Sequence, residues 1–471
     1  MSTTSLEPIP RGPAIRRGLS LLRAALRGQG IDPARDPLAA SIVFLAVPMV
    51  LEMLMESIFV VVDIFFVSKL GADAVAAVGL TEAMLALLYT VAGGLSIGVT
   101  AMVARRTGER DADGAAATTV QAILLGMAVG LIGGLQAPRL LALMGAGDTV
   151  IALGSGYTRV MLSGSGVILL LFLINASFRG AGDAAIAMRV LWLANLINLI
   201  LDPLLIFGIG PFPELGVTGA AVATTTGRSV AVLAQLGTLL FANGRLRLRA
   251  RHLHLHPAVM ARLVRLSATG MFQIFIATAS WIGLTRILAG FGSAALAGYT
   301  ISIRIVLFAL LPAWGLANAA ATLVGQSLGA RDPGRAERAV WIAAFMNLVF
   351  LGAIGILILA TAPLIVSWFG GDAQTGHIAT HALRIVSAGF FFYAFGMVLT
   401  QSFNGAGATW TPTLLNLFCF WLWELPLAWV LSHQSNVGPN GVFASITIAF
   451  STIAVASAWL FRRGHWKASV V

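Results

Sequence analysis

The sequence is poor in charged residues and has almost no cysteine. Of its 471 residues, 10% are charged and 58% are hydrophobic. A soluble domain carries about 25% charged residues, so water cannot solvate so apolar a fold and a bilayer has to do so. The single cysteine, Cys419, excludes an intrachain disulfide, and its apolar neighbours indicate a small buried side chain.

Several motifs of enzymes and ATP-driven pumps are also missing. The chain has no GxxxxGK[ST] loop, which argues against ATP as the energy source, and no HExxH of a metalloprotease. It has no carboxylate-rich pair of the kind that binds magnesium diphosphate in membrane prenyltransferases. We therefore predict no enzyme activity, no cofactor and no resident metal. The net charge of +11 does not indicate nucleic acid, because the basic residues occupy short loops between apolar stretches.

Long apolar stretches dominate the chain. Twelve of them reach the length of about 20 residues that a helix needs to cross a bilayer. They cover residues 41–68, 74–104, 115–138, 149–178, 184–209, 215–242, 259–289, 293–328, 337–368, 379–404, 410–432 and 440–462. The pattern predicts an all-α membrane protein of twelve transmembrane helices. Pro48 in the first stretch is a candidate position for a bend.

The distribution of lysine and arginine predicts the orientation of these helices. With both termini in the cytoplasm, 23 of the basic residues fall in inner segments and two, Lys69 and Arg139, in outer loops. We therefore expect a bacterial inner-membrane protein with both termini inside. Residues 16–27, RRGLSLLRAALR, fit either a basic amphipathic helix on the cytoplasmic leaflet or a mobile tail.

Three short motifs recur with nearly constant spacing. The matched segments are 71–77 with 292–298, 108–111 with 329–332, and 178–182 with 403–407, at offsets of 221, 221 and 225. Six spans separate the copies, so both halves have the same orientation and are related by an axis along the membrane normal. The repeat predicts two pseudo-symmetric six-helix bundles.

These features divide the chain into five segments. We expect a cytoplasmic basic tail at 1–40, a first lobe at 41–242, a linker at 243–258, a second lobe at 259–463 and a tail at 464–471. Three linker histidines, His252, His254 and His256, alternate like metal ligands on a strand. No carboxylate or cysteine joins them in sequence, so we favour a solvated linker over a metal site.

Acidic residues inside the predicted spans are the strongest functional signal. A carboxylate at the bilayer centre costs about 2.5–3.5 kcal/mol, so its presence needs a reason. At about 100° per residue, Glu52, Glu56 and Asp63 share one face of the first span. They are predicted either to line a substrate path or to pair with an arginine such as Arg159 or Arg228.

A second polar group is predicted in the fifth and sixth spans. Asn198 and Asp202 share a helix face, and Asp202, Thr224 and Asp63 fall at a similar depth. Two carboxylates in a low dielectric favour proton uptake by one of them. With the neighbouring amide and hydroxyl oxygens they fit Na⁺ as well. The alternative for Asp202 is a structural role beside Pro203.

The second half lacks this pair. The counterpart of Asp202-Pro203 reads Leu425-Pro426, and the adjacent Glu424 should face about 100° away. The seventh span has Gln273 but no acid. Aromatic residues are frequent in this half and suit either lipophilic cations or simple packing. They are Phe390, Phe391, Phe392, Tyr393, Trp410, Trp421 and Trp423.

Taken together, these motifs resemble the multidrug and toxic compound extrusion (MATE) family in its DinF-like branch. The resemblance runs from about Ser41 to Arg463. Its most specific pieces are Pro48, Val62-Asp63, 69–71, 104–108, 178–183, 198–203 and 215–224. It implies two lobes of six helices and efflux of lipophilic, chiefly cationic compounds in exchange for H⁺ or Na⁺.

The resemblance also implies residue roles. By motif, the ion-coupling site is Asp63, Asn198, Asp202 and Thr224, which is also where Na⁺ would bind, with Asn175 as a further polar position. Pro48 matches a helix hinge. Glu52 and Glu56 depart from the branch and are predicted, with Asp63, to attract substrate, or else to provide a second protonation step.

The expected partners are the bilayer and small lipophilic or cationic substrates, and we expect a monomer. The alternative function is a lipid-linked precursor flippase of the wider superfamily. That function predicts a cationic cavity for a diphosphate. The arginines inside the spans that would form it are Arg159, Arg228, Arg286, Arg304 and Arg384.

The charge distribution leads to a topology prediction. Reporter tags at Arg249 and at the carboxyl terminus should be cytoplasmic, and tags at Glu214 and Asn436 should be periplasmic. Alkaline phosphatase and green fluorescent protein fusions report the two sides separately. A periplasmic signal at Arg249 would contradict the predicted orientation.

Overall fold

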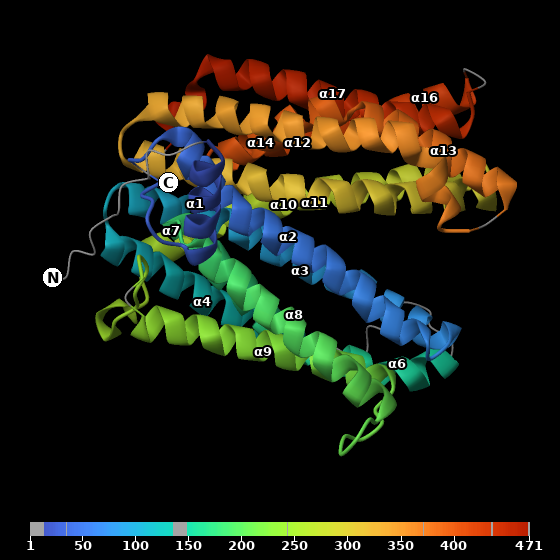
Figure 1. Ribbon diagram of the computed structural model, residues 1–471, viewed down its shortest axis with the longest axis horizontal. Helices are drawn as coiled ribbons and strands as arrows, with labels where there is room; N and C mark the ends of the chain where they lie inside the picture. Colours follow the sequence, from blue (N-terminus) through green and yellow to red (C-terminus); the bar gives the residue numbers. More distant parts are fainter. Residues whose placement is uncertain are drawn as a thin grey trace.

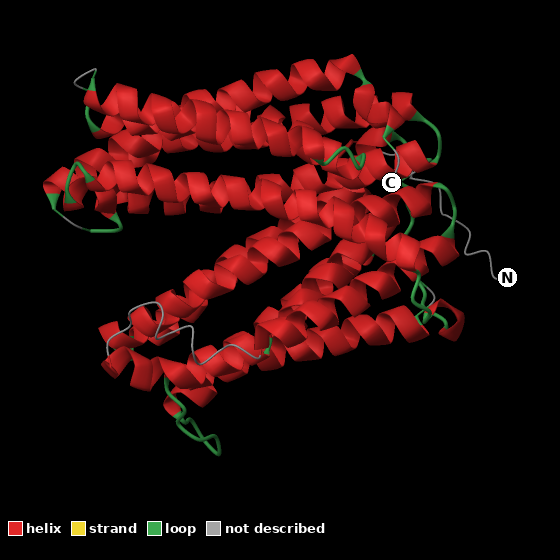
Figure 2. Cartoon of the chain, turned by 180° about the vertical axis from the view of Figure 1, so that it is seen from behind, coloured by secondary structure: helices red, strands yellow, loops and turns green. Residues whose placement is uncertain are grey.

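In the computed structural model of the protein, residues 14–33, 35–134, 148–242, 244–370, 372–434 and 437–469 are described. Every regular element in these ranges is helical (Figure 2). Nine of the described helices are long and apolar enough to cross a membrane, and the number is eleven if each of two bent pairs forms one span. The predicted all-helical membrane class is confirmed.

The first half contains the helices that follow the amphipathic α1, Ala14–Arg27. They are α2 (Leu38–Ser68), α3 (Ala72–Gly108), α4 (Ala112–Gly134), α6 (Asp148–Ser163), α7 (Ser165–Ala181), α8 (Ala184–Phe207) and α9 (Val217–Phe241). α9 corresponds to the sixth predicted span but does not qualify by composition, since it carries Arg228 and the threonines 224–226. Its 25 residues are still long enough, at about 1.5 Å each, to cross the hydrocarbon.

The second half repeats this order after the short linker turn η1, Ala250–His252. Its helices are α10 (Pro257–Ala289), α11 (Ser293–Gly329), α12 (Pro333–Ser367), α13 (Ala373–Ala388), α14 (Phe390–Gly405), α15 (Trp410–Asn416), a π-helical segment η2 (Leu417–Glu424), α16 (Leu425–His433) and α17 (Pro439–Arg463). The chain ends in the turn η3, His465–Ala468.

Two predicted spans are not straight. The fourth breaks between α6 and α7 with a bend of 44°, and the tenth between α13 and α14 with a bend of 55°. Gly164 and Gly389 stand at the two breaks, 225 residues apart, which is the offset of one of the repeated motifs. The sequence analysis treated both stretches as continuous, because apolar content does not reveal where a helix breaks.

The internal repeat is visible in the backbone. Gly71 and Gly292, at the starts of α3 and α11, have φ of 100° and 94° with ψ of 175° and 174°. These angles are accessible almost only to glycine. Arg110 and Arg331 both have φ of 60° in the following turn of each half. Equivalent turns therefore connect equivalent helices, as the sequence offsets predict.

The two halves are interlocked at the end where the termini lie and diverge toward the other end (Figure 1). α2 packs on α11 and α3 packs on α10. A Cβ at Gly108 would collide with the carbonyl oxygen of Gln326, and one at Gly329 with that of Arg105. Glycine at these positions lets the backbones of α3 and α11 approach closely.

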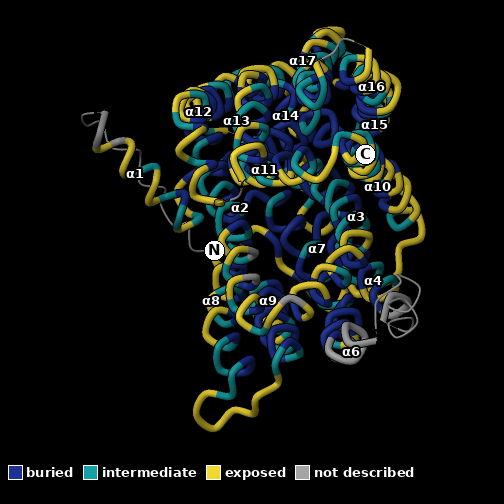
Figure 3. Tube along the Cα trace, turned by 90° about the vertical axis from the view of Figure 1, so that its right-hand side faces the viewer, coloured by how far each residue is buried: buried dark blue, intermediate teal, exposed yellow. Residues whose placement is uncertain are grey.

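The outer surface of the described helices carries large apolar side chains, as lipid contact requires. Phe241, Leu233 and Trp368 are all exposed. Figure 3 shows buried positions toward the centre and exposed positions on the outward sides of α10, α12, α16 and α17. Because no aqueous surface accommodates this apolar cover, the exposed faces are those that meet the bilayer.

The amino-terminal segment forms a helix, which was one of the two arrangements considered. α1 lies against α2, with Ala25 buried and Leu19 and Leu22 exposed. Arg139, Asn436 and the end of the third predicted span lie outside the described residues.

Candidate functional site

A cavity of about 420 Å³ lies within the first half. Five helices contribute its walls. The lining residues are Glu56, Phe59 and Asp63 of α2, Glu82, Leu85, Ala86 and Tyr89 of α3, Tyr157 and Met161 of α6, Phe172 of α7, and Thr224 and Arg228 of α9. Three carboxylates and four aromatic rings therefore surround a single guanidinium group. This combination suits a lipophilic molecule that carries positive charge.

A buried polar cluster adjoins this cavity through Thr224. The Asn198 amide donates to Asp202 Oδ1 at 3.1 Å and to Thr224 Oγ1 at 3.0 Å. Asp202 is fully buried, and its Oδ2 has no hydrogen-bond partner among the described residues. Asp63 lies close enough for its charge to act on Asp202. The structure thus brings together Asp63, Asn198, Asp202 and Thr224 from three helices.

Close packing of α8 and α9 makes this cluster possible. Gly227 and Gly219 on α9 face the carbonyl oxygens of Ala194 and Leu205 on α8, so closely that a Cβ at either glycine would clash. One turn from Gly227, Thr224 is brought within reach of Asn198. Asn198 and Asp202 are four residues apart, so their side chains stack on one face of α8.

Asn175 belongs to a different network. Arg179 Nη1 lies 2.7 Å from Glu52 Oε1, and the Asn175 amide lies 3.4 Å from the same oxygen. Gln235 on α9 donates to Asn175 Oδ1 at 2.6 Å. The resemblance assigned Asn175 to the ion-coupling cluster, but among the described residues its hydrogen bonds go to Glu52 and Gln235 and not to that cluster. Instead, Asn175 helps to hold a buried ion pair.

Glu52 does not line the cavity. Its side chain is 2% exposed and pairs with Arg179, which sequence analysis had assigned to an inner loop. This placement does not fit the predicted contact of Glu52 with substrate and agrees with the alternative of an arginine partner. The partner is neither Arg159 nor Arg228. Arg179 lies in the last turn of α7, and residue spacing within α2 carries no information about a side chain on another helix.

Glu56 lines the cavity together with Arg228. Arg228 is buried, donates to the Tyr89 hydroxyl at 3.1 Å and lies over the Phe59 ring at 5.7 Å. Its positive charge acts on Glu56 and on Asp63. Arg228 therefore occupies part of the space that a cationic aromatic substrate would fill.

Sequence analysis missed Glu82, although the same signal was present. Glu82 is an acid well inside the second predicted span, and it lines the cavity. Its charge also interacts with Arg304 on α11, so it faces the second half of the molecule. Tyr89 and Tyr157 were missed for a different reason, since tyrosines in a membrane helix do not stand out from packing residues.

The remaining arginines inside the spans do not form a cationic cavity. Of the five named for the flippase alternative, only Arg228 lines the 420 Å³ cavity, and it stands among three acids. The side chains of Arg159, Arg286, Arg304 and Arg384 are exposed. This arrangement does not favour a diphosphate at this site.

The aromatic residues of the second half mostly face outward. Phe391, Phe392, Trp410, Trp421 and Trp423 are exposed, which favours their role in packing or lipid contact. A small cavity of about 20 Å³ lies in this half, between the side chains of α10, α11, α13, α14 and α17. Within the membrane-spanning helices of the described chain, the substrate-sized cavity is therefore in the first half, while another cavity of about 540 Å³ lies between the start of α4 and the linker.

The linker is not wholly solvated. His252 is buried and its Nε2 lies 3.0 Å from Asp113 Oδ1 on α4, while His254 and His256 are exposed. A carboxylate therefore does join one of the three histidines, His252, but it comes from a part of the chain that is distant in sequence. No group of three metal-ligating side chains occurs among the described residues.

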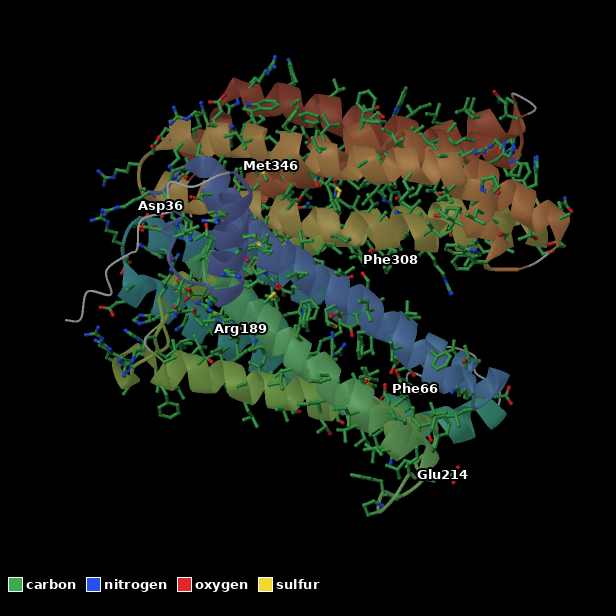
Figure 4. The ribbon with its side chains drawn as sticks, in the orientation of Figure 1. Asp36, Phe66, Arg189, Glu214, Phe308 and Met346 are labelled. Atoms are coloured by element: carbon green, nitrogen blue, oxygen red, sulfur yellow. The ribbon has the colours of Figure 1, made fainter. Side chains whose placement is uncertain are left out.

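Figure 4 relates the site to the ends of the molecule. Asp36 lies at the end that carries the termini, while Phe66 and Glu214 lie at the opposite end. Two helical halves of equal orientation, joined at one end and enclosing a polar cavity in one half, define a secondary transporter.

A comparison with family models identifies the family. The MatE model matches residues 48–204 and 271–430, once in each half and over most of the chain. The chain therefore belongs to the MatE family of membrane transporters, and it is not an enzyme.

Relatives and solved structures agree with this assignment. "Probable multidrug resistance protein YoeA" of Bacillus subtilis is 27% identical over 420 residues, 86% of this chain and 89% of its own. The "FAD transporter" of Shewanella oneidensis is 28% identical over 410 residues, 86% and 90% of the two chains. A MATE transporter solved in an outward-facing conformation is 26% identical, with a TM-score of 0.85 over 98% of this chain and 100% of that one.

The Glu52–Arg179 pair leads to a stability prediction. Arg179→Met should leave a buried, unpaired carboxylate and lower the free energy of unfolding by about 3–5 kcal/mol. Glu52→Gln combined with Arg179→Met should recover much of that loss, since no buried charge remains. Thermal unfolding of the purified variants measures both effects. Additive losses in the double variant would show that the two side chains are not an energetic pair.

Proposed function

We propose that this transporter is an antiporter that exports lipophilic compounds, chiefly cationic ones, in exchange for H⁺ or Na⁺. The observation that carries the proposal is the direct connection between the acidic, aromatic cavity and buried Asp202. Thr224 lines the cavity and shares the Asn198 amide with Asp202. A substrate in the cavity and an ion at Asp202 therefore act on the same few side chains.

Competition between substrate and ion explains exchange. With both Asp63 and Asp202 ionised, the like charges repel each other and attract a cation. A proton on one of them, or Na⁺ held by the carboxylates and the Asn198 and Thr224 oxygens, removes this attraction. A cationic substrate then loses its counter-charge and leaves. Alternating occupancy of one lobe by ion and substrate is the requirement for antiport.

We propose Pro48 as the hinge of α2. It has no N–H to bond the carbonyl of Phe44, so the helix is weakened at that turn. The next residues, Met49 and Val50, are fixed against Gly315 of α11, where a Cβ would clash with their backbone. Beyond this contact, Val61 and Phe65 are exposed. A bend at Pro48 would move Glu56 and Asp63 while the inner end of α2 stays in place.

The distribution of acidic residues also supports a proposal for the branch of the family. We propose the DinF-like branch, because α10 carries Gln273 and no acid, so the proposed coupling residues lie in the first half. We propose that the protein is a monomer in a bacterial inner membrane, with both termini in the cytoplasm. Its proposed lobes cover residues 41–242 and 259–463, and the linker between them covers residues 243–258. The charge asymmetry of the loops supports this orientation.

The coupling proposal predicts the effect of removing either charge. Asp63→Asn and Asp202→Asn should each abolish ethidium export driven by a pH or Na⁺ gradient in proteoliposomes, because asparagine mimics the protonated acid. The double variant should be no worse than either single variant, since the two carboxylates act as a unit.

Asp73→Asn is the matched control. Asp73 is exposed in the first turn of α3, and its variant should export normally. If Asp202→Asn inserts normally and pumps at the rate of the unmodified protein, the coupling site lies elsewhere.

The cavity predicts charge selectivity. Glu56→Gln should weaken export of cationic dyes by about tenfold, equivalent to about 1.4 kcal/mol, and leave neutral dyes nearly unchanged. Apparent affinities for a matched cationic and neutral dye pair measure this difference. Glu52→Gln is the control, because Glu52 does not line the cavity, and it should not change the ratio. Equal losses for both dyes in Glu56→Gln would indicate a structural role for Glu56.

A further inference from the structure

The second half contains one acid buried inside the membrane-spanning region. Its four acids are Asp332, Glu337, Asp372 and Glu424. The first three precede or begin helices near the membrane surface, whereas Glu424 ends the π-helical segment η2 and is 1% exposed. Neither the proposed coupling cluster nor the 420 Å³ cavity includes this side chain. A buried carboxyl group in this position needs its own explanation.

The hydrogen bonds of Glu424 are incomplete. Ser280 on α10 lies with its hydroxyl 3.3 Å from Glu424 Oε2 and 3.2 Å from the Ala277 carbonyl oxygen, so one hydrogen serves two acceptors. Glu424 Oε1 is buried with no partner among the described residues. An ionised carboxylate held by half of one hydrogen bond is poorly solvated, and a proton on Oε1 would remove its charge.

Glu424 lies at the end of a π-helical segment. Residues Leu417–Glu424 form this wider turn, which directs the side chains at its end differently from a regular α-helix. As a result Glu424 points inward to Ser280. Such π-helical segments are frequent at functional sites.

A small cavity provides room for a water molecule near this carboxyl group. The 20 Å³ cavity is lined by Trp281, next to Ser280, and by Tyr299 and Tyr393. The charge of Glu424 acts on both tyrosines. A space of this size accommodates about one water. A water in this space would supply a proton carrier between the two tyrosines.

No fixed charge competes for Glu424 among the described residues. The titratable side chain beside it on η2 is Cys419, and α11 and α14 contribute Tyr299 and Tyr393. The helices packed on η2 carry other titratable groups, none of which forms an ion pair with Glu424 in the described structure. These are Arg262, Arg265 and Arg286 on α10, His433 on α16, and Arg462 and Arg463 on α17.

We propose that Glu424 is a second proton-binding site, located in the second half, that gains and loses a proton during the transport cycle. An O–H bond forms at Oε1 when the proton is taken up and breaks when it is released, and no other bond changes. The ligand is H⁺ and not Na⁺, because the carboxyl group and one shared hydroxyl offer too few oxygens for a metal cation. The inference goes beyond the proposed antiport, since it concerns a site separate from Asp63 and Asp202.

Infrared difference spectroscopy on the full-length protein in lipid tests the site directly. The probe is the proton itself, delivered by a change from alkaline to acidic buffer. The unmodified protein should show a carboxylic C=O band that appears on acidification, shifts in D₂O, and is lost in Glu424→Gln. Asp202→Asn should keep this band. Glu337→Gln, which removes an acid that pairs with Lys467 near the surface, is the matched control and should keep the Glu424 band.

Two variants keep the proposal falsifiable. A pH difference spectrum of folded Glu424→Gln identical to that of the unmodified protein would overturn it, because the carboxyl group would then have a constant protonation state. If Glu424→Gln does not fold, Ser280→Ala decides. Loss of the shared hydroxyl should shift the midpoint of the band without removing the band, and an unchanged midpoint overturns the proposal.

Proton counting separates this site from the proposed coupling site. In proteoliposomes, Glu424→Gln should lower the number of protons exchanged per dye molecule, while export continues. An unchanged ratio overturns the participation of Glu424 in the cycle. If Asp202→Asn still pumps while the Glu424 band titrates, the proposed coupling at Asp202 fails and the second proton site stands.

Discussion

A carboxylate inside a bilayer needs a counter-charge, a set of hydrogen-bond donors or a proton, and this requirement organises the interior of the protein. Glu52 has a counter-charge in Arg179, reinforced by Asn175. Among the described residues, Asp202 has a donor in Asn198 and one oxygen without a partner, and Glu424 has a shared serine hydroxyl and one oxygen without a partner. Glu52 also has an oxygen without a partner, but its charge is neutralised by Arg179, which suits a structural role. Asp202 and Glu424 form no ion pair in the described part of the chain, which suits binding of an ion.

The backbone packing separates a fixed region from a region that can move. Glycines on α3 and α11 allow the two halves to interlock at the end that holds the termini. The cavity, Asp63 and the exposed outer part of α2 lie beyond this interlocked region. Pro48, the proposed hinge, stands beside the contact of α2 with Gly315, so the proposed bend and the anchor occupy adjacent positions. The proposed motion of the outer part would then reach the proposed ion site without loss of the interface.

The two halves have the same backbone turns but different interior side chains. Glycines with matching positive φ, including Gly71 and Gly292, start equivalent helices. The interior of the first half contains a cavity lined by three acids. The interior of the second half is packed with side chains and contains one acid, at the end of a π-helical segment. Duplication of a fold therefore preserves the connections, because they depend on backbone conformation, and leaves the side chains free to diverge.

The sequence alone determined the membrane class, the positions of the apolar spans and the repeat, because these depend on composition, length and spacing along the chain. It also placed Asn198 and Asp202 on one face of α8, because both belong to one regular helix. Only the tertiary structure decided that Glu52 pairs with Arg179, that Asn175 joins that pair, and that Glu82 shares the cavity with Glu56. These relations connect different helices, and the rotation and depth of one helix against another are set by packing. The direction of Glu424 was also decided by the structure, since a π-helical turn breaks the regular 100° step on which any sequence-based estimate depends.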